Sequence, residues 1–429
     1  MFPWAPRVGL DNIGATCYMN ATLQCFGQIE EFALFFKLDD KVNQSIEKCY
    51  KENKKCLSSS FKILMDKIWP DEAMQIESKN RHFPPDEFKS KLEKMNLLLN
   101  NNIKDLLLFI ILNLHEELNQ NSNDNNVNTN MNRSSNNNNY NFDQSYKIFL
   151  EDYQRKFNSK ISELFCAIKK NRIECLNCRK TLYDFQEYFF TVFPLQEIKN
   201  YTIKKLENNM HFNNMNNNLI LNNNNNFNMN NMVMGIPPYN NNIINMNNNF
   251  GPINNNFNFP FQNFPINNNS FIPINNMMNN MNLNSIKLNK LNNNIIDILD
   301  CFEYNQKTEL LKDCDKIFCN NCMKVADSYY YSSLETSPKI LIILLKQEDR
   351  INIKIKLEFN RILDITNYVS HKNGNQNIQY KLISVISHSG DNKNNIQYFA
   401  HCLSPIDDKW YTYNDAMVNE IDNFQKKYY

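Results

Sequence analysis

The chain has 429 residues and 46 Lys and Arg against 45 Asp and Glu, a net charge of +1 that excludes a strongly basic nucleic-acid binder and an acidic tail protein. It contains no run of about 18 apolar residues and no secretory signal in its first residues, so we expect neither a membrane partner nor export. Its 12 Cys residues therefore point to reduced thiols, metal ligands or a nucleophile in the cytoplasm or nucleus, rather than to disulfides.

Residues 1–118 are predicted to be mainly helical. A first helix is expected over residues 17–36, after Thr16 as its N-cap, because apolar residues recur there at near-helical spacing. A second helix is expected at Asp105–Glu117, where apolar residues again fall on one side. We assign Glu117 to the ordinary solvated face of this helix.

Two tracts are dominated by asparagine. Residues 119–141 contain 13 Asn in 23 positions, and residues 208–294 contain 40 Asn in 87 positions. Asparagine disfavours helix and strand interiors because its amide competes for backbone hydrogen bonds, so both tracts are predicted to be disordered insertions. They leave two further ordered blocks, residues 142–207 and residues 295–429.

The later blocks are predicted to be rich in strands. Their aromatic and β-branched segments are separated by turn residues, as is typical of antiparallel sheets. Helices followed by antiparallel strands predict an α+β fold class. The segments predicted as strands are YDFQEYFFTVFPL, KILIILLK, YKLISVISHS, QYFAHCLS and KWYTYND.

The segment GLDNIGATCYMN carries a candidate nucleophile, Cys17, at the predicted start of the first helix. Unpaired N–H groups and the helix dipole at that position favour a thiolate. Asn12, five residues earlier, offers an amide that could donate to a developing oxyanion. Cys25, eight residues later, is predicted to be an ordinary core residue.

Two C-x₂-C pairs predict a metal site. Cys175 and Cys178 form the first pair, and Cys319 and Cys322 form the second. Four thiolates give a closed tetrahedral site, which suits structural rather than catalytic zinc. The remaining cysteines, including Cys49 and Cys56, have no matching spacing and are predicted to be core or surface thiols.

The segment GLDNIGATCYMNATLQ closely resembles the Cys box of the ubiquitin-specific proteases, a family of cysteine deubiquitinases. The segment Tyr380–Val418 resembles the His box of the same family. The resemblance implies a papain-like hand with a helical thumb (1–118), a β palm and zinc-tipped fingers, the last two built from 142–207 and 295–429. It implies that Cys17 is the nucleophile, Asn12 the oxyanion donor and ubiquitin or a ubiquitinated protein the partner.

The position of the family's catalytic His is occupied by Gln397, and its orienting partner corresponds to Asn414, followed by Asp415. If a hairpin turns at Pro405–Ile406, Gln397 and Asn414 face each other across the strands. A glutamine can hold this hydrogen bond but cannot accept the thiol proton. The resemblance further makes Asn102, at the position of a family Asp, and Asp415 predicted substrate-binding residues.

Two other histidines could replace the missing base. His401 lies on the strand of Gln397 but about 13 Å along it, at about 3.3 Å per residue, which is too far for a contact with the thiol. His388 would need its loop to refold. Without a base, we predict strongly reduced hydrolysis.

The sequence therefore favours a thiol-dependent deubiquitinase with weakened activity. The alternative is a catalytically inactive pseudo-protease that acts as a ubiquitin-binding module. A third reading, a zinc-ribbon nucleic-acid binder, is disfavoured because a net charge of +1 without a basic cluster attracts phosphates weakly.

Overall fold

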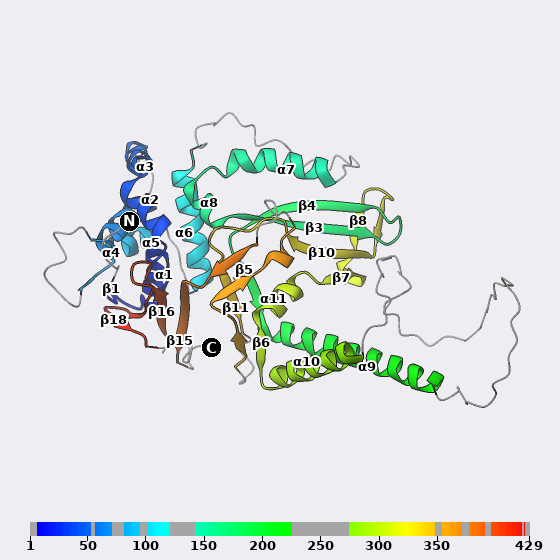
Figure 1. Cartoon of the computed structure of the whole chain (residues 1–429). Helices are drawn as coiled ribbons and strands as arrows, with labels where there is room; N and C mark the ends of the chain where they lie inside the picture. The colour runs from blue at the N-terminus through cyan, green and yellow to red at the C-terminus, as the bar shows by residue number, and fades with distance from the viewer. Residues whose placement is uncertain are drawn as a thin grey trace, which may run out of the picture. The chain divides into compact units, whose positions relative to one another are not determined.

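The computed structural model describes residues 7–52, 56–70, 81–94, 102–120, 142–224, 274–347, 354–370, 377–390, 396–422 and 424, without the side chains of residues 212–282. The chain forms two compact units, one made of residues 1–200 and 294–429 and the other of residues 201–293. Figure 1 labels the helices and strands of the chain, of which α10 and most of α9 belong to the second unit. The predicted domain boundaries stay predictions.

The first helices of the described structure all end before residue 166. They are α1 (Cys17–Gly27), α2 (Glu30–Leu38), α3 (Asp40–Lys51), α4 (Leu57–Ile68), α5 (Asp86–Lys94), α6 (Ile103–Leu118), α7 (Phe142–Lys156) and α8 (Lys160–Phe165). Three more follow: α9 (Leu195–Asn224), α10 (Ile274–Asn292) and α11 (Ile298–Asn305). Short 3₁₀ helices occupy Asp313–Asp315 and Thr366–Tyr368.

Two short strands lie among these helices, and the other described strands follow from residue 167 onward. They begin with β1 (Val8–Leu10), β2 (Arg81–Phe83), β3 (Ala167–Cys175), β4 (Thr181–Tyr188), β5 (Thr191–Pro194), β6 (Ile295–Asp297), β7 (Thr308–Leu311), β8 (Ile317–Cys319) and β9 (Lys324–Ala326). They continue with β10 (Ser328–Leu334), β11 (Ile343–Lys346), β12 (Lys356–Glu358), β13 (Ile362–Asp364), β14 (Gln379–Lys381), β15 (Ser384–Ser389), β16 (Gln397–Leu403), β17 (Trp410–Asn414) and β18 (Met417–Glu420).

Two four-stranded antiparallel sheets dominate, in the orders β4-β3-β10-β7 and β15-β16-β17-β18. The predicted mixture of helices and antiparallel sheet is therefore confirmed. Three short parallel pairs, β1 with β2, β5 with β11 and β6 with β12, are additional. They join segments far apart in the chain, which a local pattern of alternation does not reveal.

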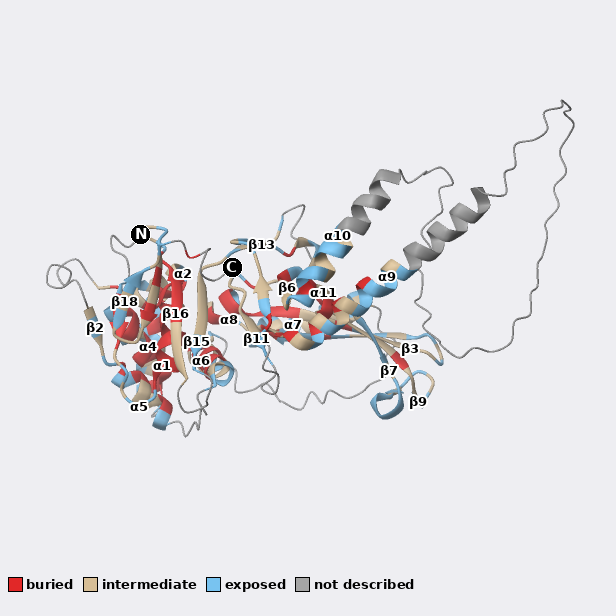
Figure 2. Ribbon diagram, turned by 90° about the horizontal axis from the view of Figure 1, so that it is seen from below, coloured by how far each residue is buried: buried red, intermediate tan, exposed pale blue. Residues whose placement is uncertain are grey.

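The helical core surrounds α1 and α2. Phe26, Phe32, Phe61 and Phe165 are buried and pack with ring centroids 5.5–6.0 Å apart, in mostly edge-to-face contacts. Such aromatic pairs each add about 0.5–1.5 kcal/mol beyond the burial of their surface. Figure 2 marks buried residues along α1 and along β16, which packs against it. This core fixes the helix that carries Cys17.

The first predicted helix is in fact two helices. The expected helix over residues 17–36 ends at Gly27, and α2 begins at Glu30. Thr16 occupies the N-cap position of α1 but makes no side-chain cap bond. Its hydroxyl instead accepts from the backbone of Ile13 (3.1 Å), because the preceding turn folds back on itself. The second predicted helix is α6.

The hairpin of β16 and β17 has a different register from the predicted one. Ala400 pairs with Tyr413, so the turn lies one residue later than Pro405–Ile406 and the facing partners shift by two positions. A shift of two keeps every side chain on the same face of the sheet. Gln397 and Asn414 therefore remain on one face, although they are not directly opposite.

The prediction of disorder for residues 208–294 is wrong at both ends of the tract. Helix α9 runs on to Asn224 and α10 covers Ile274–Asn292. A helix can continue through asparagine, because each such residue costs it less than about 0.7 kcal/mol. The central residues 225–273, and residues 121–141 of the first tract, lie outside the described residues.

Candidate active site and metal cluster

Cys17 is the first residue of α1, and its side chain is only 8% exposed. Gly14 and Ala15, just before it, both have left-handed backbone conformations, with φ of 105° and 50°. This conformation costs energy for alanine and is typical of functional turns. The turn leads into the start of α1, which packs against β16, and Cys17 Sγ lies 3.6 Å from the carbonyl oxygen of Ile396. The thiol thus reaches the residue directly before Gln397.

Asp415 links the two halves of the site. Its carboxylate accepts hydrogen bonds from the side-chain amides of Asn12 (3.0 Å), Asn20 (2.8 Å) and Gln397 (3.0 Å). Gln397 also donates to the side-chain oxygen of Asn414 (2.8 Å). The structure therefore brings Asn12, Gln397, Asn414 and Asp415 together beside the start of α1.

Asn12 is the predicted oxyanion donor, and its amide is held from both ends. Its oxygen accepts from the backbone N–H groups of Gly14 (3.2 Å) and Thr16 (3.3 Å), which closes the turn before Cys17. Its nitrogen faces Asp415. The second hydrogen of the amide is the group that could point at a substrate.

The described histidines are not bonded to the Cys17 sulfur. His388, on β15, lies with its ring 5.8 Å from that of Tyr398, and His211 is exposed on α9. The others have partners elsewhere: His82 with Asp11 (2.6 Å), His115 with Ser159 (2.7 Å), and His401 with Ser387 (2.7 Å) and Thr412 (3.0 Å). His401 is buried and hydrogen-bonded on both ring nitrogens, and His371 lies outside the described residues.

Tyr398 and Tyr18 flank the thiol without replacing a base. Burial, and to a smaller extent the charge of Cys17, raises the pKa of both hydroxyl groups. Each hydroxyl therefore stays protonated at neutral pH. A neutral phenol can donate a hydrogen bond, but it does not take a proton from a thiol.

Asn102, predicted to bind substrate, lies at the start of α6. Its oxygen accepts from the backbone N–H of Lys104 (3.0 Å), and its amide donates to Asp105 (2.9 Å). Asparagine is a preferred N-cap, so this contact explains the residue through the helix alone. Both of these partners lie in α6 itself, whereas the group around Asp415 is built from other segments.

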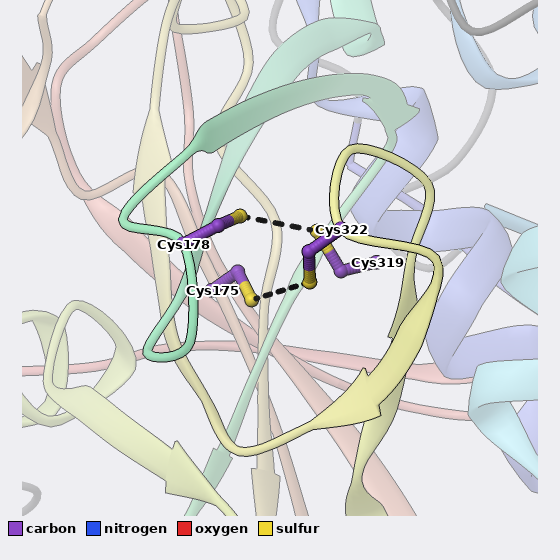
Figure 3. Close-up of side chains that lie close together, drawn as sticks. All are labelled: Cys175, Cys178, Cys319 and Cys322. Atoms are coloured by element: carbon purple, nitrogen blue, oxygen red, sulfur yellow. Dashed lines mark hydrogen bonds between the residues drawn. The ribbon is translucent and has the colours of Figure 1, made fainter.

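The four predicted metal ligands converge between two hairpins. Cys175 is the last residue of β3 and Cys178 lies in the turn after it, whereas Cys319 and Cys322 lie in the β8–β9 hairpin. Figure 3 draws the four side chains pointing toward one another. Their Sγ atoms all lie within 4.8 Å of one another, with 3.9 Å between Cys175 and Cys322 and 3.6 Å between Cys178 and Cys319. The spacing predicted this cluster correctly.

The local backbone of the cluster is the same in both hairpins. Arg179 and Met323, each directly after the second cysteine of its pair, have left-handed φ values of 60° and 54°. Hydrogen bonds from the Lys180 backbone and the Asn321 side chain lower the pKa of the Cys178 thiol to about 6. Four converging thiols are the donor set that zinc prefers, so the residues fit a tetrahedral zinc site.

One residue of the site escaped the sequence analysis. Asn20 is 1% exposed and donates to the backbone oxygens of Leu10 (3.2 Å) and Asp11 (3.1 Å) as well as to Asp415. It joins α1 to the segment that carries Asn12. A polar amide within a helix predicted to be buried was the available signal, because buried polar groups need partners.

Known proteins resemble this chain in sequence. Residues 8–428 match the family model described as ubiquitin carboxyl-terminal hydrolase. Ubiquitin carboxyl-terminal hydrolase 12 of Saccharomyces cerevisiae is 26% identical over 206 residues, which is 45% of this chain and 16% of that protein. Ubiquitin carboxyl-terminal hydrolase 2 of Bos taurus is 31% identical over 136 residues, which is 30% of this chain and 22% of that protein.

A solved structure supports the fold. The structure described as yeast SAGA DUBm with an Sgf73 mutant aligns with 100% of this chain and 67% of its own chain, at a TM-score of 0.51 and 16% identity. The matches to the two relatives above span less than a quarter of those proteins. Within the described residues, the helices include none long and apolar enough to cross a membrane. The family model nevertheless covers nearly the whole chain, and this protein belongs to the ubiquitin carboxyl-terminal hydrolase family.

Proposed function

We propose that this chain is a ubiquitin-specific protease domain that removes ubiquitin from proteins through the Cys17 thiol, at a rate weakened by Gln397. The observation that carries the proposal is the approach of Cys17 Sγ to Ile396 (3.6 Å), next to a side chain held by Asn414 and Asp415. The helices α1–α6 then correspond to the thumb, β15–β18 to the palm and the β4-β3-β10-β7 sheet to the fingers.

The proposed reaction begins with attack of the Cys17 sulfur on the carbonyl carbon at the ubiquitin C-terminus. The oxyanion that forms would receive a hydrogen bond from Asn12. A glutamine at position 397 can neither remove the thiol proton nor protonate the leaving amine. General acid–base catalysis is typically worth about 10²–10⁴-fold, so the loss of the imidazole is expected to slow turnover by this order.

A ubiquitin-binding pseudo-protease is the second candidate. The observation in its favour is that the Gln397 amide already donates to two partners, Asn414 and Asp415, as a structural residue would. In this reading the fold and the ubiquitin surface are kept, and Asn102 and Asp415 contribute to binding. The chemistry of Cys17 would then be unused.

The test is hydrolysis of ubiquitin with a fluorogenic C-terminal amide by the purified chain and its Gln397→His variant. We expect slow hydrolysis that Cys17→Ala abolishes, and a gain of about 100-fold or more in Gln397→His, because an imidazole next to Asn414 restores the base. Gln186→His, at an exposed position on β4, is the matched control and should change nothing.

The outcomes separate the two candidates. Binding of unmodified ubiquitin without any Cys17-dependent turnover would favour the pseudo-protease. A wild-type rate equal to that of Gln397→His would contradict the weakened hydrolase, because another base would then be acting. Failure to bind ubiquitin at all would overturn both.

We also infer that Cys175, Cys178, Cys319 and Cys322 hold a structural zinc ion. The support is the convergence of four thiols at the exposed end of a narrow sheet, where the chain has few apolar contacts to hold two hairpins together. Because thiolate ligands need reduced cysteines, we propose a reducing compartment, the cytoplasm or nucleus, for this protein.

A further inference from the structure

A second group of metal-binding side chains lies in the helical half of the first unit, apart from the four-cysteine cluster. Cys49 comes from the last turn of α3, Cys56 directly precedes α4, and Glu117 lies in the last turn of α6. One sulfur from each cysteine and one carboxylate oxygen all lie within 4.8 Å of one another. Three helices from different parts of the sequence therefore present three donors to one point.

The two thiols are well shielded from solvent. Cys49 is 6% exposed and Cys56 is 0% exposed. Buried cysteines are often plain core residues, but a core residue needs no carboxylate beside it. Here a carboxylate approaches both sulfurs, so the surroundings are unlike an apolar core.

Glu117 is fixed by the start of α4. Its two carboxylate oxygens accept the backbone N–H groups of Leu57 and Ser58, at 2.7 Å each. The assignment of Glu117 to a solvated helix face is therefore wrong. Burial raises the pKa of the Glu117 carboxyl, and its hydrogen bonds with the Leu57 and Ser58 backbone and with the Ser58 and Cys56 side chains oppose that rise. The contact with Cys56 already brings the carboxylate and a sulfur together. The donor is thus held in position before any ion arrives.

We propose that Cys49, Cys56 and Glu117 form a second binding site for a thiophilic divalent metal ion, with zinc as the best match. Two thiolates and one carboxylate are a donor set that zinc accepts, whereas magnesium and calcium prefer oxygen alone. Binding forms two metal–sulfur bonds and one metal–oxygen bond and releases the two thiol protons to solvent. This inference does not depend on the proposed deubiquitinase activity.

The fourth position of the ion has a nearby candidate. The Ser58 hydroxyl oxygen lies 3.2 Å from Cys56 Sγ, so either this hydroxyl or a water molecule could complete a tetrahedron. An ion at this point would join α3, α4 and α6, which already pack on one another. Its role would be to stabilise the connection between α3 and α4.

The experiment measures zinc bound to the full chain, purified under reducing conditions, by elemental analysis against protein concentration. The decisive comparison is between the wild type and Cys49→Ser, which leaves the Glu117 contacts with α4 intact. We expect Cys49→Ser to hold one equivalent of zinc fewer than the wild type. Cys301→Ser is the matched control, because Cys301 is also buried in a helix and bonds only to the Asp297 carbonyl oxygen in the described structure.

A spectroscopic arm separates the second site from the four-cysteine cluster. In the double variant Cys178→Ser and Cys319→Ser, bound cobalt should still give a thiolate charge-transfer band. Adding Cys49→Ser should remove that band. Thermal unfolding without metal checks that each variant is folded.

Two results would overturn the proposal. The first is an equal zinc content in folded Cys49→Ser and in the wild type, which would make these thiols ordinary core residues. The second is a Cys49–Cys56 disulfide in the protein purified without reductant. It would overturn the proposal if, after reduction, it formed again in the presence of added zinc. Mass spectrometry detects it as the loss of two hydrogen atoms.

Discussion

At the scale of single residues, the site is organised by one carboxylate. Asp415 has a left-handed backbone conformation, with φ of 49°, and accepts from Asn12, Asn20 and Gln397. Aspartate and asparagine tolerate this conformation better than other residues with side chains. The residue directly after Asn414 is therefore the centre of the site's hydrogen bonds, whereas the sequence suggested only a contact with substrate.

Replacing the carboxylate tests this arrangement. Asp415→Asn keeps a residue type that tolerates a left-handed backbone. It replaces one carboxylate oxygen, an acceptor, with an NH₂ group, which faces the donating amides of its partners. We expect a loss of about 1–3 kcal/mol in the free energy of unfolding, because the buried Asn20 amide would lose its charged acceptor. Urea unfolding of Asp415→Asn beside the exposed control Asp422→Asn provides the measurement. Equal midpoints for the two variants would contradict the central role of Asp415.

The residues show how far the sequence could be used. Spacing was enough to predict that Cys175, Cys178, Cys319 and Cys322 lie together, because a metal knuckle is a local pattern. It could not assign Glu117, whose partners Leu57 and Ser58 lie about sixty residues earlier in the chain. The apolar pattern of a helix indicates which of its residues face the core. It does not indicate that the start of another helix, here α4, packs beside Glu117.

At the scale of elements, β1 holds the turn of Asn12 against the end of the β17–β18 hairpin. The backbone N–H of Leu10 donates to Asp415 O (2.9 Å), and Gly9 lies against Ala416. A Cβ atom at Gly9 would lie 2.2 Å from the Ala416 backbone oxygen, closer than any real contact. The close approach explains a glycine inside this strand.

Gly9→Ala should therefore move β1 away from the hairpin. We expect a loss of unfolding free energy at the upper end of the usual range for single mutations, about 3 kcal/mol, together with weaker labelling of Cys17 by an electrophilic ubiquitin probe. Gly27→Ala is the comparison, because its Cβ would meet the side chain of Ile68 at 3.0 Å rather than a backbone atom at 2.2 Å. Similar stability of both variants would show that β1 does not depend on this approach.

The predicted register of the β16–β17 hairpin was wrong, but it still placed Gln397 and Asn414 on the same face of the sheet. The β16–β17 register differs by two residues from the one inferred from a turn at Pro405–Ile406. Turn length is set by local bonds, here Ser404 N to Lys409 O (2.8 Å), that the alternation of side chains does not encode. Since the error was an even number, Gln397 and Asn414 still met. An error of one residue would have separated them.

At the scale of the whole molecule, the residues proposed for catalysis and metal binding lie in one unit. The second asparagine tract lies mostly in the other unit. Cys17, Gln397 and both proposed metal sites lie in the unit made of residues 1–200 and 294–429. Helices α9 and α10 bound the part of the tract that is outside the described residues. The site is therefore assembled from segments on either side of a long insertion, whose length costs little loop-closure entropy.

Removing the centre of the insertion tests this division. Residues 225–273 would be replaced by about twelve Gly and Ser residues, which keeps α9 and α10 in the chain. Each halving of a loop changes its closure free energy by about 0.6 kcal/mol, so two halvings should stabilise the chain by about 1.2 kcal/mol at most.

We expect zinc content, ubiquitin binding and Cys17 labelling to match those of the full chain, because no residue assigned to these functions is removed. The control replaces the same residues by an unrelated polar sequence of equal length, which separates the effect of length from that of composition. If ubiquitin binding falls in both variants, the tract itself takes part in binding. The asparagine-rich sequence would then be a functional surface of the protein rather than a tolerated insertion.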